Sequence, residues 1–175
     1  MMTHDIAEFE RVSLDQYIRD TLLFESYDDV GTEALKESIK EEWLNIKLPV
    51  RATLGAAGYD FYLPHDVCLT EHPVTIYTGI CCSIQPGWAL FLMPRSGLGF
   101  KYGVRLSNSL GLIDEDYYHA ANEGHIAAKI YAGDKPVSLQ AGDRFMQGVF
   151  LPYGTASNGN LGGVRIGGTG STGLG

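Results

Sequence analysis

The chain has 175 residues, a formal net charge of -8 at pH 7, and a composition that is 45% hydrophobic and 19% charged. This length predicts one domain with a substantial hydrophobic core and, at most, a small appendage. The negative charge argues against direct nucleic-acid binding, which needs a basic face to neutralise phosphates. We expect no membrane span and no secretory signal, because no apolar run approaches about 18 residues and no basic segment precedes an apolar one at the N-terminus.

The cysteines indicate a reducing compartment. The odd number and the adjacent pair make Cys68, Cys81 and Cys82 a poor disulfide framework. We therefore expect reduced side chains that fill strands of a cytoplasmic protein. His65, Cys68 and His72 lie near one another, but without a fourth ligand at zinc-like spacing they do not predict a metal site.

Residues 1–45 carry two helical patterns. Ser13 is a candidate N-cap for a first helix whose apolar residues recur on one face as far as Leu22. The second pattern, from Ala34 to Trp43, is rich in Glu and Lys. We expect an acidic helical extension that packs on the domain or offers a surface to a protein partner.

Residues 46–153 have the texture of a β domain. Short apolar segments recur between Pro and Gly turn signals, namely FYLP, VTIYTGI, WALFLMP, GLID, HIAAKIYA and FMQGVFLPY. Such spacing is typical of a sandwich, barrel or jelly roll, and no helical periodicity is visible after Trp43. Residues 154–175 are polar and dense in glycine, which predicts a flexible C-terminal arm.

The stretch from Leu106 to Ile126 concentrates chemically useful side chains. Asn108, Gly111, Asp114 and Tyr117 fall within it, and Asp114 ends an apolar strand-like run. Strict two-residue alternation would place Asp114 and Tyr117 on opposite faces of a strand. If they share a pocket, a turn or bulge must fall between them.

Two other segments suit anion binding. Arg95, Ser96 and Gly97 combine a forked cation, a short hydroxyl donor and a backbone that can approach a ligand closely. The segment GGTGSTG at residues 167–173 offers further backbone amides. Because it lacks the lysine of a P-loop, it does not indicate a P-loop NTPase.

Taken together, these segments form an ordered set. The chain contains AAGYDF (56–61), PRSGLGFKYGV (94–104), LSNSLGLIDEDYY (106–118), RFMQ (144–147) and RIGGTGSTG (165–173). The set resembles, motif by motif, the signature of the trimeric dUTP pyrophosphatases (dUTPases) over roughly residues 46–175. The resemblance implies an all-β, jelly-roll-like β-barrel subunit, a homotrimer with active sites between subunits, and hydrolysis of dUTP to dUMP and pyrophosphate.

The resemblance also implies roles for residues. Asp114 matches the general base that activates the water attacking the α-phosphate, Asn108 the amide that reads uracil, and Tyr117 the ring that packs on deoxyribose and excludes a 2′-hydroxyl. Further substrate-binding positions are Arg95, Ser96, Gly97, Gly111, Gln147, Arg165, Gly168, Thr169, Gly170, Ser171 and Thr172. Mg²⁺ is expected on the triphosphate oxygens and water, with Asp60 as a candidate link to the metal or to an inter-subunit network.

The chain departs from the family pattern in three places. YHAANE at residues 118–123 lengthens a turn that is short in the family, and we expect His119 and His125 there to be surface or capping groups. Arg165 lies one residue closer to the following glycines than usual. Thr169 stands where the family usually has a phenylalanine that stacks on uracil.

Two alternatives remain open. A dCTP deaminase shares the fold but uses a glutamate on the strand after the third motif, where this chain has HIAAKIYA with Lys129 as its only charged residue. An interaction or regulatory protein on a dUTPase scaffold would use residues 1–45 as its partner surface. The intact set of Asp114, Asn108 and Tyr117 favours the enzyme.

Overall fold

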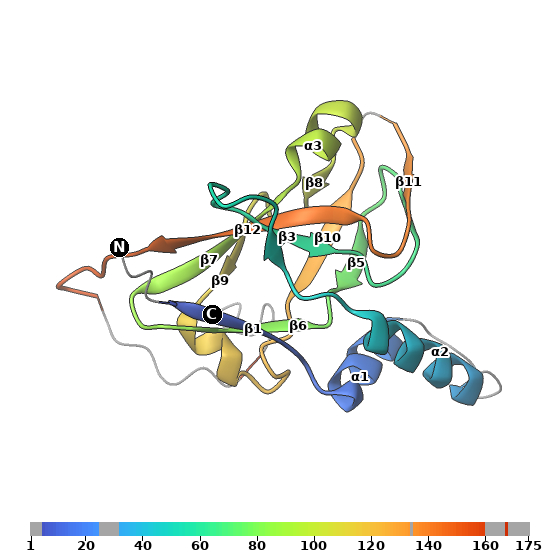
Figure 1. Ribbon diagram of the computed structural model, residues 1–175, viewed down its shortest axis with the longest axis horizontal. Coiled ribbons are helices and arrows are strands. Elements are labelled where there is room, and N and C mark those ends of the chain that lie inside the picture. Colours follow the sequence, from blue (N-terminus) through green and yellow to red (C-terminus); the bar gives the residue numbers. More distant parts are fainter. Residues whose placement is uncertain (1–4, 25–31, 134, 160–166, 168–175) are drawn as a thin grey trace.

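The computed structural model describes residues 5–24, 32–133, 135–159 and 167 of the chain. The elements follow in the order β1 (Ala7–Arg11), α1 (Leu14–Phe24), α2 (Thr32–Asn45), β2 (Val50–Arg51), β3 (Tyr59–Tyr62), β4 (Val67–Leu69), β5 (Val74–Tyr77), β6 (Ile80–Ile84), β7 (Trp88–Pro94), α3 (Ser96–Tyr102), β8 (Arg105–Leu106), β9 (Gly111–Ile113), the 3-10 helix η1 (Glu115–His119), β10 (Ala127–Tyr131), β11 (Val137–Leu139) and β12 (Arg144–Pro152). The predicted all-β class is confirmed, and Figure 1 shows the strands with α1 and α2 at one end.

The strands pair in antiparallel sheets. The largest sheet has the order β2-β3-β12-β7-β9, a second has the order β5-β10-β8, and two pairs join β1 with β6 and β11 with β4. Fully buried side chains from strands and helices meet in one hydrophobic cluster, which includes Phe61, Leu90, Ile130, Phe145, Tyr17 and Ile39. This cluster fixes the sheets relative to one another and so positions the loops at the strand ends.

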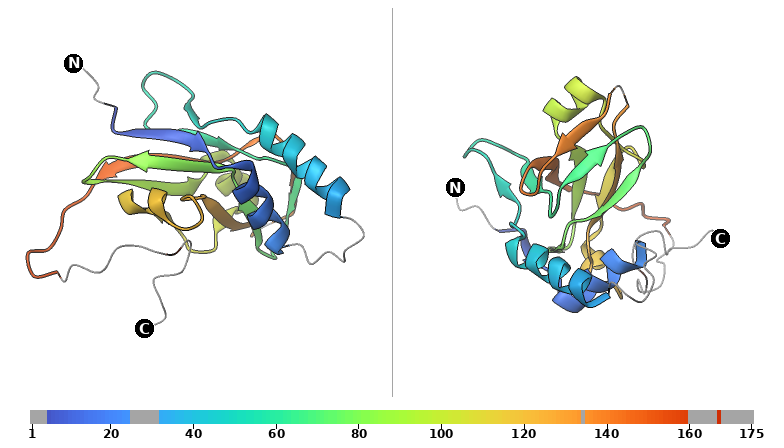
Figure 2. Two further views of the ribbon diagram at one scale, coloured as in Figure 1. Left: turned by 90° about the horizontal axis from the view of Figure 1, so that it is seen from below. Right: turned by 90° about the vertical axis from the view of Figure 1, so that its right-hand side faces the viewer.

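The first 45 residues contribute a strand as well as the two predicted helices. β1 pairs with β6 from Ala7 opposite Ile84 to Arg11 opposite Ile80. The sequence interpretation missed β1, because five residues with two glutamates give only a weak apolar alternation. Two views at right angles to the first show α1 and α2 lying against one end of the strands (Figure 2).

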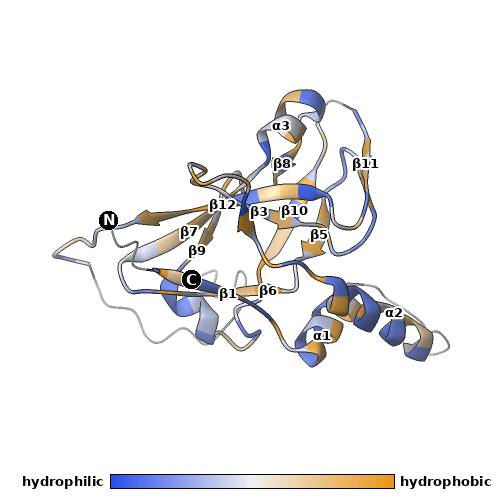
Figure 3. Cartoon of the chain, in the orientation of Figure 1, coloured by the Kyte–Doolittle hydropathy of each residue, from blue (hydrophilic) through white to orange (hydrophobic). Residues whose placement is uncertain are grey.

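The apolar faces of the two helices are used in this packing. Tyr17 is fully buried and Ile39 is 2% exposed. In Figure 3 both helices carry hydrophobic and hydrophilic residues side by side along the chain. The interpretation of residues 1–45 as a partner surface therefore gains no support from the fold.

Two short helical segments follow Trp43, where the sequence shows no helical periodicity. α3 has seven residues and η1 has five, so neither is long enough to display a repeating apolar face. Within the described residues, no helix has the length and hydropathy needed to cross a bilayer.

Candidate active site

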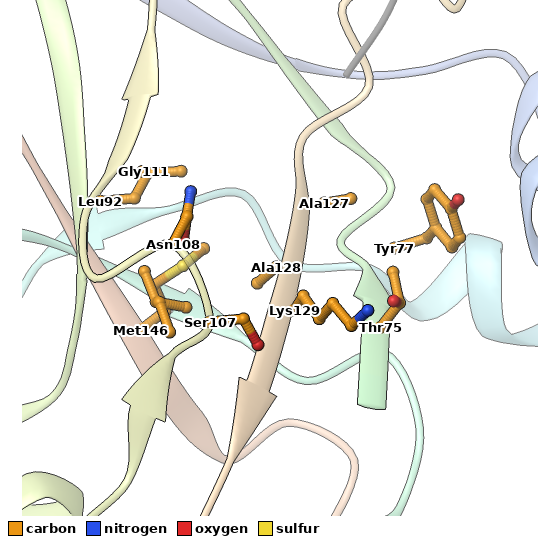
Figure 4. A pocket seen from close by; sticks show the side chains of 11 residues that line it. Thr75, Tyr77, Leu92, Ser107, Asn108, Gly111, Ala127, Ala128, Lys129 and Met146 are labelled. Atoms are coloured by element: carbon orange, nitrogen blue, oxygen red, sulfur yellow. The ribbon is translucent and has the colours of Figure 1, made fainter. Parts of the chain in front are cut away.

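A tight turn between β8 and β9 carries Asn108. The backbone amide of Ser109 donates to the Leu106 carbonyl at 3.0 Å, and that of Leu110 donates to the Asn108 carbonyl at 2.7 Å. Ser109 adopts a left-handed conformation with φ of 64°, which a non-glycine residue rarely takes. The turn leaves the Asn108 side chain in a pocket between the strands (Figure 4).

This pocket has a volume of about 520 Å³. It is lined by Thr75, Tyr77, Leu92, Leu106, Ser107, Asn108, Gly111, Ala127, Ala128, Lys129 and Met146. Apolar walls with a few polar groups are typical of a small-molecule site. Gly111 is required for its shape, because a Cβ there would lie 2.9 Å from Cβ of Leu92.

Asp114 and Tyr117 follow directly after β9. The strand ends at Ile113, and the 3-10 helix η1 begins at Glu115, with the Tyr117 amide donating to the Asp114 carbonyl at 3.1 Å. Asp114 is the extended N-cap residue of η1, and the tight turn that follows it ends the two-residue alternation of the strand before Tyr117 is reached. The break in alternation that a shared pocket requires is therefore present.

Tyr117 is held firmly in place. Tyr117 is only 5% exposed, and its hydroxyl donates to the backbone carbonyl of His125 at 2.9 Å. The same hydroxyl accepts a hydrogen bond from Nδ2 of Asn122 at 3.0 Å. The ring is thus anchored through its polar end rather than by packing alone.

A second cluster contains the cations expected near a triphosphate. Nε of Arg95 lies 3.2 Å from Oδ1 of Asp60, and Nη1 of Arg144 lies 3.1 Å from Oδ2 of the same carboxylate. Asp60 lies on β3 and Arg144 on β12, whereas Arg95 directly follows β7 as the N-cap residue of α3; Gln147 pairs with Asp60 across the ladder. A cavity of about 310 Å³ beside them is lined in part by Arg95, Gly97, Lys101 and Arg144. Ser96 and Gly97 begin α3 next to it.

Asp114 and the Arg95 cluster of one chain lie toward opposite ends of β7. Ile113 pairs with Leu90, and Arg95 follows Leu90 by five residues. With about 3.3 Å of rise per strand residue, Arg95 is roughly 17 Å along the sheet from Ile113, and Asp114 lies further away still. One chain cannot bring Asp114 and Arg95 to the same phosphorus atom.

The described residues do not form a dedicated metal site. They contain no group of three or more His, Cys, Asp and Glu side chains that could hold an ion. Both carboxylate oxygens of Asp60 contact guanidinium groups, an arrangement that does not fit a direct metal ligand. His65 instead lies 3.4 Å from a carboxylate oxygen of Glu42.

Some predicted positions fall in another part of the chain. Arg165, Gly168, Thr169, Gly170, Ser171 and Thr172 lie outside the described residues. Conversely, the sequence interpretation overlooked Thr75 and Tyr77 of β5 as pocket residues. Lys129 also lines the pocket, and the sequence could have indicated this, since it is the only charged residue on its strand.

Comparison with known proteins identifies the family. The sequence model of the dUTPase family matches residues 44–166 of the chain. This chain belongs to the dUTPase family. Members of this family are hydrolases of nucleotide metabolism, and the all-β subunit with its motif-bearing loops is the expected scaffold.

Curated dUTPase relatives support the same assignment. The deoxyuridine 5′-triphosphate nucleotidohydrolase of Shewanella piezotolerans is 42% identical over 110 residues, which cover 60% of this chain and 69% of that protein. The enzyme of the same name from Actinobacillus pleuropneumoniae serotype 3 is 42% identical over 115 residues, covering 63% and 73% respectively.

Solved dUTPase structures share the fold. The crystal structure of the Streptococcus mutans dUTPase is 33% identical, with a TM-score of 0.59, and the match covers 86% of this chain and 98% of that one. Because residues 44–175 make up only about three quarters of this chain, that match extends into the residues before 44. A variant dUTPase of Staphylococcus aureus phage phi11, reported with a structural Mg(II) ion, is 21% identical over 67% of this chain and 90% of that one, with a TM-score of 0.55, and shows the fold alone.

Proposed function

We propose that this dUTPase-family chain hydrolyses dUTP to dUMP and pyrophosphate, with Asp114 as the general base. The observation that carries the proposal is the continuity of the motif. One short strand, β9, joins the turn that puts Asn108 and Gly111 in the pocket to the 3-10 turn that carries Asp114 and Tyr117.

Asp114 accepts a proton from the attacking water. The new bond forms between the water oxygen and the α-phosphorus, and the bond from that phosphorus to the bridging oxygen breaks, so that pyrophosphate leaves. Carboxylates are weak bases, so the orientation of the water must supply much of the rate. Arg95, Ser96 and Gln147 neutralise and orient the phosphate oxygens.

The pocket selects the nucleoside. The Asn108 amide pairs with the edge of uracil beside the backbone of Gly111, and the Tyr117 ring packs on deoxyribose where a 2′-hydroxyl would collide. A nucleobase that covers the Asn108 amide without pairing with it costs roughly 1–3 kcal/mol per missing hydrogen bond. We therefore expect a strong preference for dUTP over dCTP and UTP.

Magnesium enters as part of the substrate. Asp60 forms ion pairs with Arg95 and Arg144. The substrate is therefore the complex of Mg²⁺ with dUTP, in which triphosphate oxygens and water would ligate the ion. The bound ion neutralises negative charge on the triphosphate. Asp60 has a separate role, which is to hold the two guanidinium groups in place.

We further propose a homotrimer whose sites combine subunits. The separation of Asp114 from Arg95 along β7 supports this, because a nucleotide at one hairpin needs the cations of another chain. The C-terminal motif at residues 165–173 would close over the nucleotide. The three free cysteines fit a reducing compartment, and we propose a cytoplasmic enzyme.

Replacing the general base, Asp114, tests the mechanism. Asp114→Asn should lower kcat for dUTP by about 10²–10⁴-fold, because the amide is nearly isosteric but cannot accept the proton. Binding of a non-hydrolysable dUTP analogue should persist, which calorimetry would show. Pyrophosphate release should be assayed with dUTP, dTTP, UTP and dCTP in the presence of magnesium. Near-normal turnover by the variant would remove Asp114 from the mechanism, and ammonia release from dCTP would favour a deaminase.

A further inference from the structure

The residues that hold the Tyr117 hydroxyl are themselves held by the N-terminal segment. Helix α1 and its cap contact the chain at two points, His125 and Glu123, which both belong to residues 122–125, the segment that hydrogen-bonds the Tyr117 hydroxyl. We propose that α1 is a positioning element for Tyr117, acting through residues 122–125, and that it thereby sharpens discrimination between deoxyribose and ribose. The proposal rests on the proposed function, in which Tyr117 contacts the sugar.

The first contact is a buried pair between Asp20 of α1 and His125. Oδ2 of Asp20 lies 2.6 Å from Nδ1 of His125, and the two residues are 8% and 0% exposed. The backbone amide of Gly79 donates to Nε2 of His125 at 2.8 Å. Because Nε2 must accept that bond, the ring carries its proton on Nδ1 and donates it to Asp20. The imidazole is therefore fixed in both tautomer and orientation.

His125 in turn supports two residues on the substrate side. Its backbone carbonyl accepts the Tyr117 hydroxyl at 2.9 Å. Its ring packs against Tyr77, with 5.3 Å between ring centroids, and Tyr77 lines the pocket that contains Asn108. A displacement of His125 would therefore shift both Tyr117, which contacts the sugar, and Tyr77, which lines the pocket for the base.

The second contact joins the cap of α1 to the lengthened turn. The amide and Oγ of Ser13 both donate to the carboxylate of Glu123, each at 2.7 Å. Glu123 has a φ of 57°, a conformation that is strained for a side chain of this size. The neighbouring Asn122 donates to the Tyr117 hydroxyl at 3.0 Å. Ser13 thus stabilises the backbone conformation from which Asn122 reaches Tyr117.

The two hydrogen bonds of the Tyr117 hydroxyl, donated to the His125 carbonyl and accepted from the Asn122 amide, therefore depend on a segment that α1 and its cap contact at His125 and Glu123. A ring anchored in this way cannot move aside for a 2′-hydroxyl. Loosening either contact should leave the chemistry at Asp114 in place and admit ribose more readily.

The test compares kcat/KM for dUTP and UTP in two variants. Asp20→Ala removes the buried partner of His125, and Asn122→Ala removes one bond to Tyr117 at a half-buried position that tolerates truncation. Each should lower the ratio of dUTP to UTP efficiency by roughly three- to ten-fold, the effect of losing about one hydrogen bond. Ile39→Val in the neighbouring helix α2 is the control, because it removes one buried methyl group but none of the hydrogen bonds described above, and its ratio should stay within about two-fold of wild type.

A Tyr117→Phe background shows whether the effect passes through the hydroxyl. There, Asn122→Ala should change the ratio no further, since the bond it removes is already absent. If wild type hydrolyses dUTP and neither single variant moves the ratio, the positioning role is wrong and the proposed function stands. If wild type does not hydrolyse dUTP, hydrogen exchange decides. Faster amide exchange at residues 115–125 in Asp20→Ala than in Ile39→Val would support the role of α1 in positioning Tyr117, and equal exchange would overturn it.

Discussion

Gly79 combines two requirements that another residue could not meet together. Its φ is +71°, and a Cβ at this position would overlap Cδ1 of Ile46. Its amide donates to His125, and its carbonyl accepts from the Val12 amide at 3.0 Å. The turn between β5 and β6 thus joins three parts of the molecule: the N-terminal segment at Val12, the pocket-lining strand β5, and His125, which bonds Tyr117.

We expect Gly79→Ala to lower the free energy of unfolding by about 2–4 kcal/mol, combining left-handed strain with overpacking. Gly87→Ala is the control, because Gly87 has a φ of +85° but no atom within 4 Å of the place that a Cβ would occupy. That variant should lose only about 1–2 kcal/mol. Urea unfolding measures both values, and equal losses would show that contact with Ile46 is unimportant.

The cysteines should differ sharply in reactivity. Burial, with the nearby carboxylates of Glu10 and Glu123, raises the pKa of the Cys81 thiol from 9.0 to about 11. Burial also raises the pKa of Cys82, whereas Cys68 is exposed. Because the raised pKa favours the neutral thiol, Cys81 stabilises the fold below about pH 9, and this contribution is lost as the pH rises through 11.

A disulfide reagent such as DTNB at pH 8 should therefore titrate one thiol rapidly in the native protein and three after denaturation. Cys68→Ser should abolish the rapid phase. A second fast-reacting thiol at pH 8 would mean that the β1–β6 pair opens readily in solution.

At the scale of elements, α1 begins with a cap assembled from two distant parts of the chain. The Gln16 amide donates to Oγ of Ser13 at 3.1 Å, as in an ordinary capping box. The reciprocal bond to the Ser13 amide comes from Glu123 rather than from the first turn of the helix. Helix start and lengthened turn are therefore stabilised together.

Ser13→Ala should lower the free energy of unfolding by about 1–2 kcal/mol, the usual value of an N-cap, since the contact is exposed and screened by solvent. Ser38→Ala, at an exposed position inside α2, should change it by less than about 0.5 kcal/mol. Thermal unfolding compares the two, and a Ser13→Ala variant as stable as Ser38→Ala would argue against the shared cap.

Much of the element pattern could be predicted from the sequence. The apolar segments recur as β3, β5, β7, β9, β10 and β12, and Ser13 caps the first helix as predicted. β1 could not be recognised, because its pairing with β6 depends on contacts some seventy residues away. The prediction that His125 is a surface or capping group was wrong, because its ring is fully buried against Asp20. Its support of Tyr117, together with Asn122, could not be recognised, since a side chain's hydrogen-bond partners across a turn leave no periodic signal.

At the scale of the whole molecule, the separation of Asp114 from Arg95 gives the sharpest test of assembly. Asp114→Asn and Arg95→Ala chains should each be nearly inactive as homotrimers. Mixed and refolded together, they should regain part of the wild-type activity, because some sites then combine an intact Asp114 with an intact Arg95 from another subunit. Sedimentation would report the trimer. No recovery in mixed trimers, or full activity in a monomer, would refute a site shared between subunits.

The pairing of β1 with β6 also has a consequence for synthesis. β1 leaves the ribosome before its partner β6, which follows about seventy residues later, and the Glu123 contact of Ser13 forms later still. At a synthesis rate of roughly 5–20 residues per second, β1 remains unpaired for several seconds. Glu8 and Glu10 place charges along it during that interval. Like charges on an unpaired strand discourage edge-to-edge association, so we expect Glu8 and Glu10 to oppose pairing between translation intermediates.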